Sequence, residues 1–153
     1  MTYQEYLKQR GNEVNSLPIK FAFGQKQFEE MMAQWGLTPD DTDKIYRLGD
    51  TGGFYLKTDS DKVKAYFSKD TGLEELMKDE KFRVDAFRYE MDNHEYAINW
   101  QGDWDVLNCF SDKELVYGEY KIFSDYLNDM GHPEWIKSYV TARKSHLEMA
   151  KNW

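Results

Sequence analysis

The chain has 153 residues, a length that suits one domain able to bury about 68–70% of its unfolded surface. Its hydrophobic content of 41% is sufficient for a core and excludes an intrinsically disordered chain, while 31% charged residues predict a well-hydrated exterior. The net charge of -8 argues against direct nucleic-acid binding, because such binding needs Lys and Arg at the phosphates. We therefore expect a single globular domain over residues 1–153.

The sequence contains no apolar run long enough for a membrane span or for the core of a signal peptide. Cys109 is the single cysteine, so an intramolecular disulfide is excluded and a reducing compartment is favoured. We expect a cytoplasmic protein without a membrane partner, and the sequence indicates no oligomeric state. A nucleophilic role for Cys109 would require a histidine brought close by the fold, so a small buried cysteine is the simpler interpretation.

In chain order, the first predicted element is a short helix. It begins at a capping box formed by Thr2 and Glu5 and ends at Gly11. Residues 17–23 alternate with period two, which predicts a short strand or an extended arm. Residues 25–35 carry apolar side chains at the spacing of an amphipathic helix.

A hairpin is predicted next, from two β-prone segments at residues 45–48 and 54–57 that are joined by a glycine-rich turn. A helix follows from about residue 60. A second capping box, Thr71 with Glu74, begins another helix.

The stretch from Phe82 to Tyr96 has apolar residues on two opposite helical faces, which is typical of a helix at the centre of a domain. A pair of strands that turns at residues 92–94 is the alternative for the same stretch, and we expect the helix. Beyond it, we expect residues 96–100 to be extended and Asp103 to cap a short helix.

The last part of the chain predicts a helical hairpin. Ser111 and Glu114 form a third capping box, Gly131 ends that helix, and Pro133 lies at the first turn of the final one. The predicted fold class is therefore α+β, a mostly helical domain with a small antiparallel sheet near residues 45–57 and a C-terminal helical hairpin.

Glu90 and His94 are four residues apart, so on a helix they share one face and offer two ligands to a metal ion. Spacing identifies no third ligand. The simpler interpretation is that His94 caps the end of the helix with Glu90 beside it. We therefore predict no metal ligand, no cofactor and no catalytic residue, and a small metal-dependent hydrolase that uses these two residues is the alternative function.

The acidic charge is concentrated between Glu90 and Glu119, which together hold eight carboxylates, one lysine and two tryptophans. Carboxylates interleaved with aromatic rings are suited to receive Lys and Arg side chains, and Trp and Tyr often anchor protein interfaces. A solvated acidic face without a partner is the alternative. The segment predicts a non-enzymatic accessory protein that binds another protein. The residues predicted to contact this partner are Glu90, Asp92, His94, Glu95, Trp100, Asp103, Trp104 and Asp105.

Several short runs resemble a group of hypothetical proteins encoded on phages and mobile elements of gut bacteria. These runs are Phe21-Ala22-Phe23, Phe28-Glu29-Glu30, Gly52-Gly53-Phe54-Tyr55, Tyr89-Glu90 and Asn93-His94-Glu95-Tyr96. The resemblance leaves the terminal helical hairpin uncovered and implies no activity. It implies a setting in which small acidic proteins inhibit host defence nucleases, as anti-CRISPR or antirestriction proteins do. In that setting, the expected partner is a basic nucleic-acid-binding enzyme.

Overall fold

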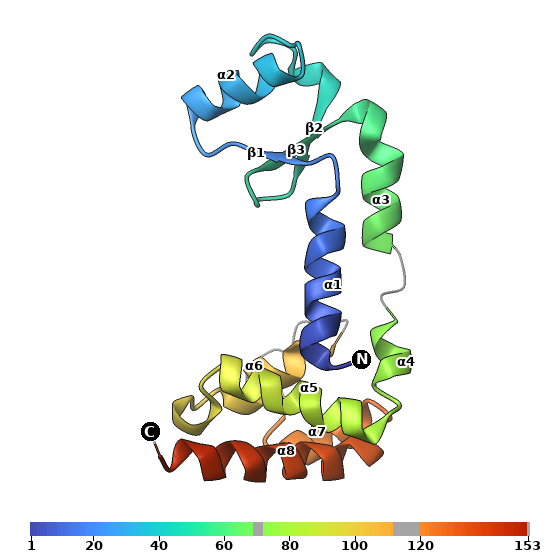
Figure 1. Cartoon of the computed structure of the whole chain (residues 1–153), viewed down its shortest axis with the longest axis vertical. Helices are drawn as coiled ribbons and strands as arrows, with labels where there is room; N and C mark the ends of the chain where they lie inside the picture. The colour runs from blue at the N-terminus through green and yellow to red at the C-terminus, as the bar shows by residue number, and fades with distance from the viewer. Residues whose placement is uncertain (69–71, 112–119, 153) are drawn as a thin grey trace. The chain divides into compact units, whose positions relative to one another are not determined.

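The computed structural model describes residues 1–68, 72–111 and 120–152, and it confirms a mostly helical α+β fold with a small antiparallel sheet (Figure 1). The chain divides into two compact units, Arg10–Asp70 and the combination of Met1–Gln9 with Thr71–Trp153. Each unit has a cluster of buried hydrophobic side chains of its own. A single globular domain therefore stays a prediction. No helix in the described ranges has both the length and the apolar character to cross a membrane.

Helix α1 (Tyr3–Asn15) starts at the predicted capping box. The Thr2 N–H donates to the Glu5 carboxylate at 2.9 Å, and the Glu5 N–H donates to the Thr2 hydroxyl at 3.1 Å. The predicted end at Gly11 is wrong, since Gly11 does not adopt a left-handed conformation and the helix continues for one more turn. In this turn Arg10 pairs with Glu13 at 3.2 Å, which supports the helical backbone on both sides of the glycine.

The unit Arg10–Asp70 contains a three-stranded antiparallel sheet in the order β1-β3-β2. Its strands are β1 (Lys20–Phe21), β2 (Ile45–Leu48) and β3 (Gly53–Leu56). The predicted hairpin is confirmed, with Ile45 opposite Leu56 and Leu48 opposite Gly53. The predicted strand at residues 17–23 shrinks to β1, because Pro18 has no N–H to donate and the Ile19 N–H donates to the Leu17 carbonyl at 2.8 Å in a tight turn.

Helical segments complete this unit. Helix α2 covers the sheet with Met31 and Met32, which pack in one buried cluster with Ala22 and Ile45. The bounds are α2 (Gln25–Gln34), the 3-10 turns η1 (Thr42–Lys44) and η2 (Lys57–Asp59), and α3 (Ser60–Ser68).

The second unit is helical, and α5 lies at its centre as predicted. The alternative pair of strands is wrong, since α5 runs unbroken from its cap Asp79, whose carboxylate accepts the Lys81 N–H at 2.9 Å. The bounds are α4 (Leu73–Leu76), α5 (Glu80–Asn93), η3 (Tyr96–Ile98), α6 (Gly102–Asn108), α7 (Phe123–Asp129) and α8 (Glu134–Ala150).

Helices α5 and α8 lie side by side and run in the same direction (Figure 1). Arg83 donates to the Ser138 hydroxyl at 2.9 Å near the start of the pair, and Asp92 contacts His146 near its end. Arg83 is buried, and its guanidinium also donates to the carbonyl of Met77 at 3.0 Å. A buried charge is tolerated when its donors are satisfied in this way.

The C-terminal helical hairpin is confirmed, with Gly131 in the left-handed conformation between α7 and α8. Along α8, Trp135 and Tyr139 are buried, and Ile136 and Val140 are partly buried against the same core. Two polar residues of α8, Ser138 and His146, also have no exposed surface.

Near the acidic segment, the structure differs from two expectations drawn from the sequence. Residues 96–98 form η3 rather than an extended segment: the Ile98 N–H donates to the Glu95 carbonyl at 3.0 Å, and the Ala97 N–H donates to His146 of α8 at 3.1 Å. Asp103 lies inside α6 and does not cap it; the cap position is Gln101. The capping boxes at Thr71 and at Ser111 with Glu114 include residues outside the described ranges.

Candidate functional site at the end of helix α5

Three side chains with metal-ligand or nucleophile chemistry meet at the end of α5. The Cys109 thiol donates to the Glu90 carboxylate at 2.9 Å and lies 3.5 Å from Nε2 of His94. The same His94 nitrogen lies 3.4 Å from the Glu90 carboxylate. Cys109 is therefore the third group that spacing along α5 did not identify, and we call these three residues the Glu-His-Cys cluster.

Local structure explains how the cluster is positioned. Glu90 and His94 share one face of the last turn of α5, and His94 is the C-terminal cap residue, as expected from the sequence. Cys109 is the cap residue of α6, and its N–H donates to the Val106 carbonyl at 3.1 Å. The packing of α6 on α5 brings the thiol to the carboxylate.

The electrostatics of the cluster keep the thiol protonated. Cys109 as a residue is exposed, so the prediction of a small buried cysteine is wrong, although its sulfur rests on Glu90. Burial of the thiol, its hydrogen bond to Glu90 and the charge of that carboxylate raise the pKa of Cys109 to about 12. Glu90 is only 5% exposed, and burial together with the charge of Glu90 raises the pKa of the Tyr3 hydroxyl.

This arrangement differs from a nucleophilic triad. In a triad the base contacts the nucleophile through one ring nitrogen and the acid through the other. Here Glu90 and Cys109 both face Nε2 of His94, and the carboxylate contacts the thiol directly. The negative charge of Glu90 disfavours the thiolate form of Cys109, so the cluster is poorly suited to nucleophilic attack. It instead brings three possible metal-ligand atoms together: a Glu90 oxygen, Nε2 of His94 and the Cys109 sulfur.

Several of the residues predicted to contact a partner make contacts within the protein. The Asp103 carboxylate accepts hydrogen bonds from the hydroxyls of Tyr96 at 2.7 Å and Tyr139 at 2.6 Å. Asp105 accepts from Asn99 at 2.8 Å. Trp104 is partly buried and packs against the core of the unit. Asp103 thereby links α6 to η3 and to α8.

Asp92 also has an internal role. Its carboxylate contacts Nδ1 of His146 at 2.7 Å and accepts from Arg88 at 3.1 Å. The Ala97 N–H donates to Nε2 of His146 at 3.1 Å, so Nε2 is an acceptor, and the Nδ1–H donates a hydrogen bond to the Asp92 carboxylate. Sequence reasoning found no motif around His146, because its partners lie far away along the chain.

The segment from Glu95 to Trp100, which we call the 95–100 loop, presents two apolar side chains to solvent. Ile98 is 74% exposed and Trp100 is 78% exposed. Glu95 has φ of 51°, a left-handed conformation that is uncommon for a residue other than glycine. Asn99 lies between the two exposed side chains and donates to the His94 carbonyl at 3.1 Å.

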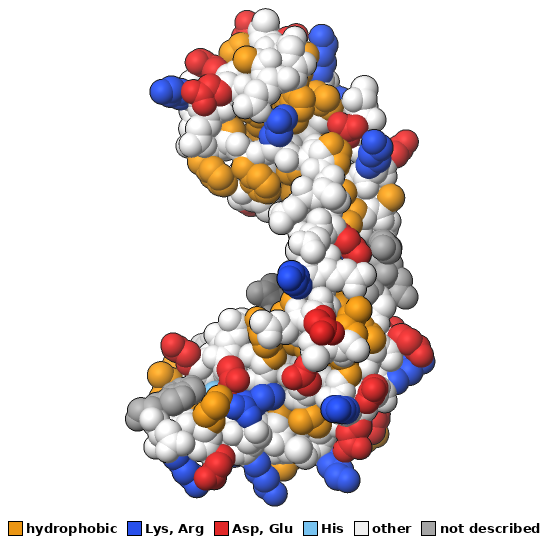
Figure 2. All heavy atoms as spheres, in the orientation of Figure 1, with side chains coloured by type: hydrophobic (Ala, Val, Ile, Leu, Met, Phe, Trp, Pro, Cys, Tyr) orange, Lys and Arg blue, Asp and Glu red, His pale blue; other side chains and the backbone are white. Residues whose placement is uncertain are grey.

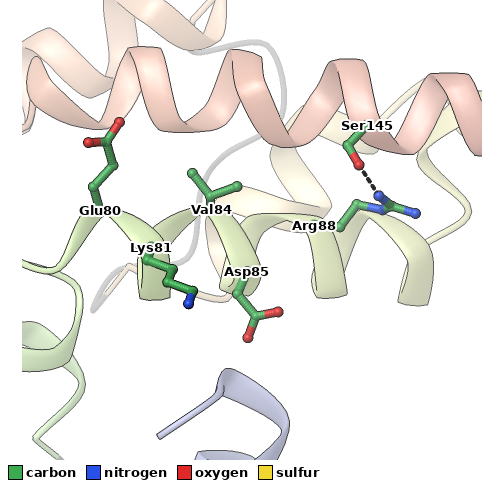
Figure 3. Close-up of a pocket in the computed structure, with 6 residues that line it drawn as sticks. All are labelled: Glu80, Lys81, Val84, Asp85, Arg88 and Ser145. Carbon is green, nitrogen blue, oxygen red and sulfur yellow. Dashed lines mark hydrogen bonds between the residues drawn. The ribbon is translucent and has the colours of Figure 1, made fainter.

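A hollow of about 500 Å³ lies elsewhere on α5 (Figure 3). Two of its charged side chains have partners within the protein: Arg88 donates to the Ser145 hydroxyl, and Asp85 accepts the Tyr3 N–H at 2.9 Å. These contacts attach α8 and the start of α1 to α5, so we do not take the hollow as the candidate site. It is lined by Glu80, Lys81, Val84, Asp85, Arg88 and Ser145.

Charges of both signs lie along α8. On the face that Figure 2 shows, Lys and Arg side chains along the edge formed by α8 are interspersed with Asp and Glu. Lys151 pairs with Glu148 at 3.0 Å. This mixture is unlike the continuous basic stripe that a nucleic-acid backbone requires.

These features define a mostly helical α+β protein with a Glu-His-Cys cluster at the end of its central helix. The chain belongs to the protein family described as "Family of unknown function (DUF7659)", which matches residues 2–111. The expectation of an uncharacterised family is thus confirmed. The match includes the whole cluster and the 95–100 loop, and it ends before α7 and α8. No curated protein and no solved structure matches the chain.

Proposed function

We propose that this protein is a non-enzymatic accessory protein that binds another protein through the 95–100 loop. The observation that carries the proposal is an alternation along the loop. Ala97 and Asn99 hydrogen-bond to the rest of the unit, while their neighbours Ile98 and Trp100 are 74% and 78% exposed. Large side chains held outward by a fixed backbone are what an interface anchor needs.

The loop is attached at several points, which reduces the entropy lost on binding. The Asn99 side chain donates to the His94 carbonyl and to the Asp105 carboxylate, and it accepts the Gln101 N–H at 3.0 Å. Because the loop is already ordered, a partner does not have to order it, and more of the contact energy contributes to affinity.

The charge of the surroundings favours a basic partner. Glu95 is exposed within the loop, and the segment that follows α5 is the most acidic part of the sequence. A basic nucleic-acid-binding enzyme has the complementary charge, and charge complementarity raises the rate of association. We propose that the partner is a host defence nuclease, and that the protein acts in the cytoplasm as an inhibitor of the anti-CRISPR or antirestriction type, encoded on a phage or mobile element.

The residues that we propose to contact the partner differ in part from those that the sequence predicts. Glu95 and Trp100 remain its centre, and Ile98 joins them because of its exposure. Asp103 and Asp105 act on this surface through the hydrogen bonds that fix its shape.

Plasmid-cleavage assays test the proposal with a panel of purified restriction and RNA-guided nucleases. We expect the protein to slow at least one nuclease, and the double variant Ile98→Ser/Trp100→Ala to need at least about tenfold more protein for the same effect. Inhibition should weaken with added salt, because exposed charges are screened. Phe67→Ala is the matched control, since Phe67 is a 57% exposed aromatic residue of the other unit. Equal inhibition by the double variant, or no inhibition across the panel, would contradict the proposal.

A further inference from the structure

We infer that Glu90, His94 and Cys109 together bind one Zn²⁺ ion. The ligands are the Glu90 carboxylate, Nε2 of His94 and the Cys109 thiolate, which lie within 4.8 Å of one another. The inference concerns a different group of side chains from the exposed residues of the 95–100 loop, and it revises the sequence-based expectation of no metal ligand.

The distances between the donor atoms fit a tetrahedral ion. With bonds of about 2.3 Å to sulfur and about 2.0–2.2 Å to nitrogen and oxygen, neighbouring ligand atoms of a tetrahedral zinc site lie about 3.4–3.6 Å apart. The distances from Nε2 of His94 are 3.5 Å to sulfur and 3.4 Å to the Glu90 oxygen. These two distances match the distances between ligand atoms of a tetrahedral zinc site.

The third distance, between the Cys109 sulfur and the Glu90 oxygen, spans the thiol proton that the metal would replace. The Cys109 sulfur and the Glu90 oxygen are 2.9 Å apart because the thiol donates a hydrogen bond, so they must separate by about 0.7 Å to coordinate one ion. On binding, the S–H bond breaks, a sulfur–zinc bond forms, and the proton leaves to solvent.

Charge and burial also favour a cation here. Glu90 is 5% exposed, and a buried carboxylate is costly unless a positive group or hydrogen bonds compensate it. Zn²⁺ with one carboxylate and one thiolate forms a site without net charge.

The donor set selects the metal and leaves one position open. A thiolate with an imidazole favours zinc over the oxygen-preferring Mg²⁺ and Ca²⁺. Three protein ligands leave a fourth coordination position, which a water molecule can take. Zinc sites with three protein ligands and a water are typical of hydrolases, so the hydrolase alternative depends on this ion. Since His94 directly precedes Glu95, the metal would also fix the base of the 95–100 loop.

Metal titration of protein purified without a polyhistidine tag tests the inference. We expect one Co²⁺ per chain with a thiolate-to-metal charge-transfer absorption in the near ultraviolet, and displacement of that signal by one equivalent of Zn²⁺. Cys109→Ser and His94→Gln should each lower zinc affinity by about 100-fold or more, measured by competition with a chromogenic chelator. Glu148→Gln and His132→Gln are the matched controls, because they change an acid and a histidine outside the cluster, and the zinc affinity of these two variants should stay unchanged.

Thermal unfolding with and without a chelator gives a second readout. Zinc should raise the unfolding midpoint of the parent protein and of both controls, and this rise should be absent in Cys109→Ser, whose fold in chelator is checked by circular dichroism. Zinc binding of unchanged strength in Cys109→Ser, or cobalt bound without the charge-transfer absorption, would overturn the inference. These measurements need no partner, so failure of the proposed inhibitor function leaves them interpretable.

Discussion

The Asp103 carboxylate accepts a hydrogen bond of 2.6 Å from the hydroxyl of Tyr139, a side chain with no exposed surface. The same carboxylate oxygen accepts from Tyr96 at 2.7 Å. We expect Asp103→Ala to lower the free energy of unfolding by about 1.5–3 kcal/mol, because a buried hydroxyl loses its charged acceptor. Urea denaturation measures this loss. Glu148→Ala, an exposed acid on α8, should change it by less than about 0.5 kcal/mol, and similar values for both variants would contradict an internal role for Asp103.

Truncation of two tryptophans of the same unit should have very different effects on the free energy of unfolding. Trp135 is 8% exposed and packs on Phe87, with ring centroids 5.8 Å apart, so Trp135→Ala should cost about 3–5 kcal/mol through lost burial and the cavity left behind. Trp100 is 78% exposed, and Trp100→Ala should change stability by no more than about 0.5 kcal/mol. Urea denaturation curves of the two variants and the parent measure these changes. A Trp135→Ala protein as stable as the parent would contradict the packing of α8 described above.

Cys109 should react slowly although it is exposed. Its pKa is raised to about 12, so the thiolate fraction at pH 8 is far smaller than in the unfolded chain. We expect an aromatic disulfide reagent to modify the metal-free native protein at least about 100-fold more slowly than the urea-unfolded protein at this pH. Glu90→Gln should accelerate the native reaction, because the carboxylate that holds the thiol proton is gone. Equal rates for native and unfolded protein would show that Glu90 does not control the thiol.

Stability should fall as the solution becomes alkaline. Burial, with a smaller effect of neighbouring carboxylates, raises the pKa values of Tyr3 and Tyr139 above the usual 10.0 of a tyrosine, and that of Cys109 above 9.0. Each folded group holds its proton more tightly than the unfolded one. Its contribution to stability is thus complete below the unfolded pKa and is lost as pH rises towards the folded pKa. We expect the urea midpoint to decrease from pH 9 upwards, and a constant midpoint between pH 8 and pH 10.5 would contradict this.

Local patterns predicted the elements whose stabilising contacts are close in sequence. The capping box of Thr2 and Glu5 begins α1, and the glycine-rich turn closes the hairpin of β2 and β3, because the partners lie within a few residues of each other. The predictions failed where a distant partner decides. Residues 96–98 turn into η3, and the Ala97 N–H finds His146 of α8 as its acceptor.

For the candidate site, the sequence by itself determined that Glu90 and His94 share a face, since a helix places residues four apart side by side. Only the tertiary structure decided that Cys109 completes the cluster and that Asp103 turns inward to Tyr139. The physical reason is that both contacts depend on how α6 packs against α5 and α8, and such packing arises from the whole set of buried side chains rather than from the spacing of any two residues.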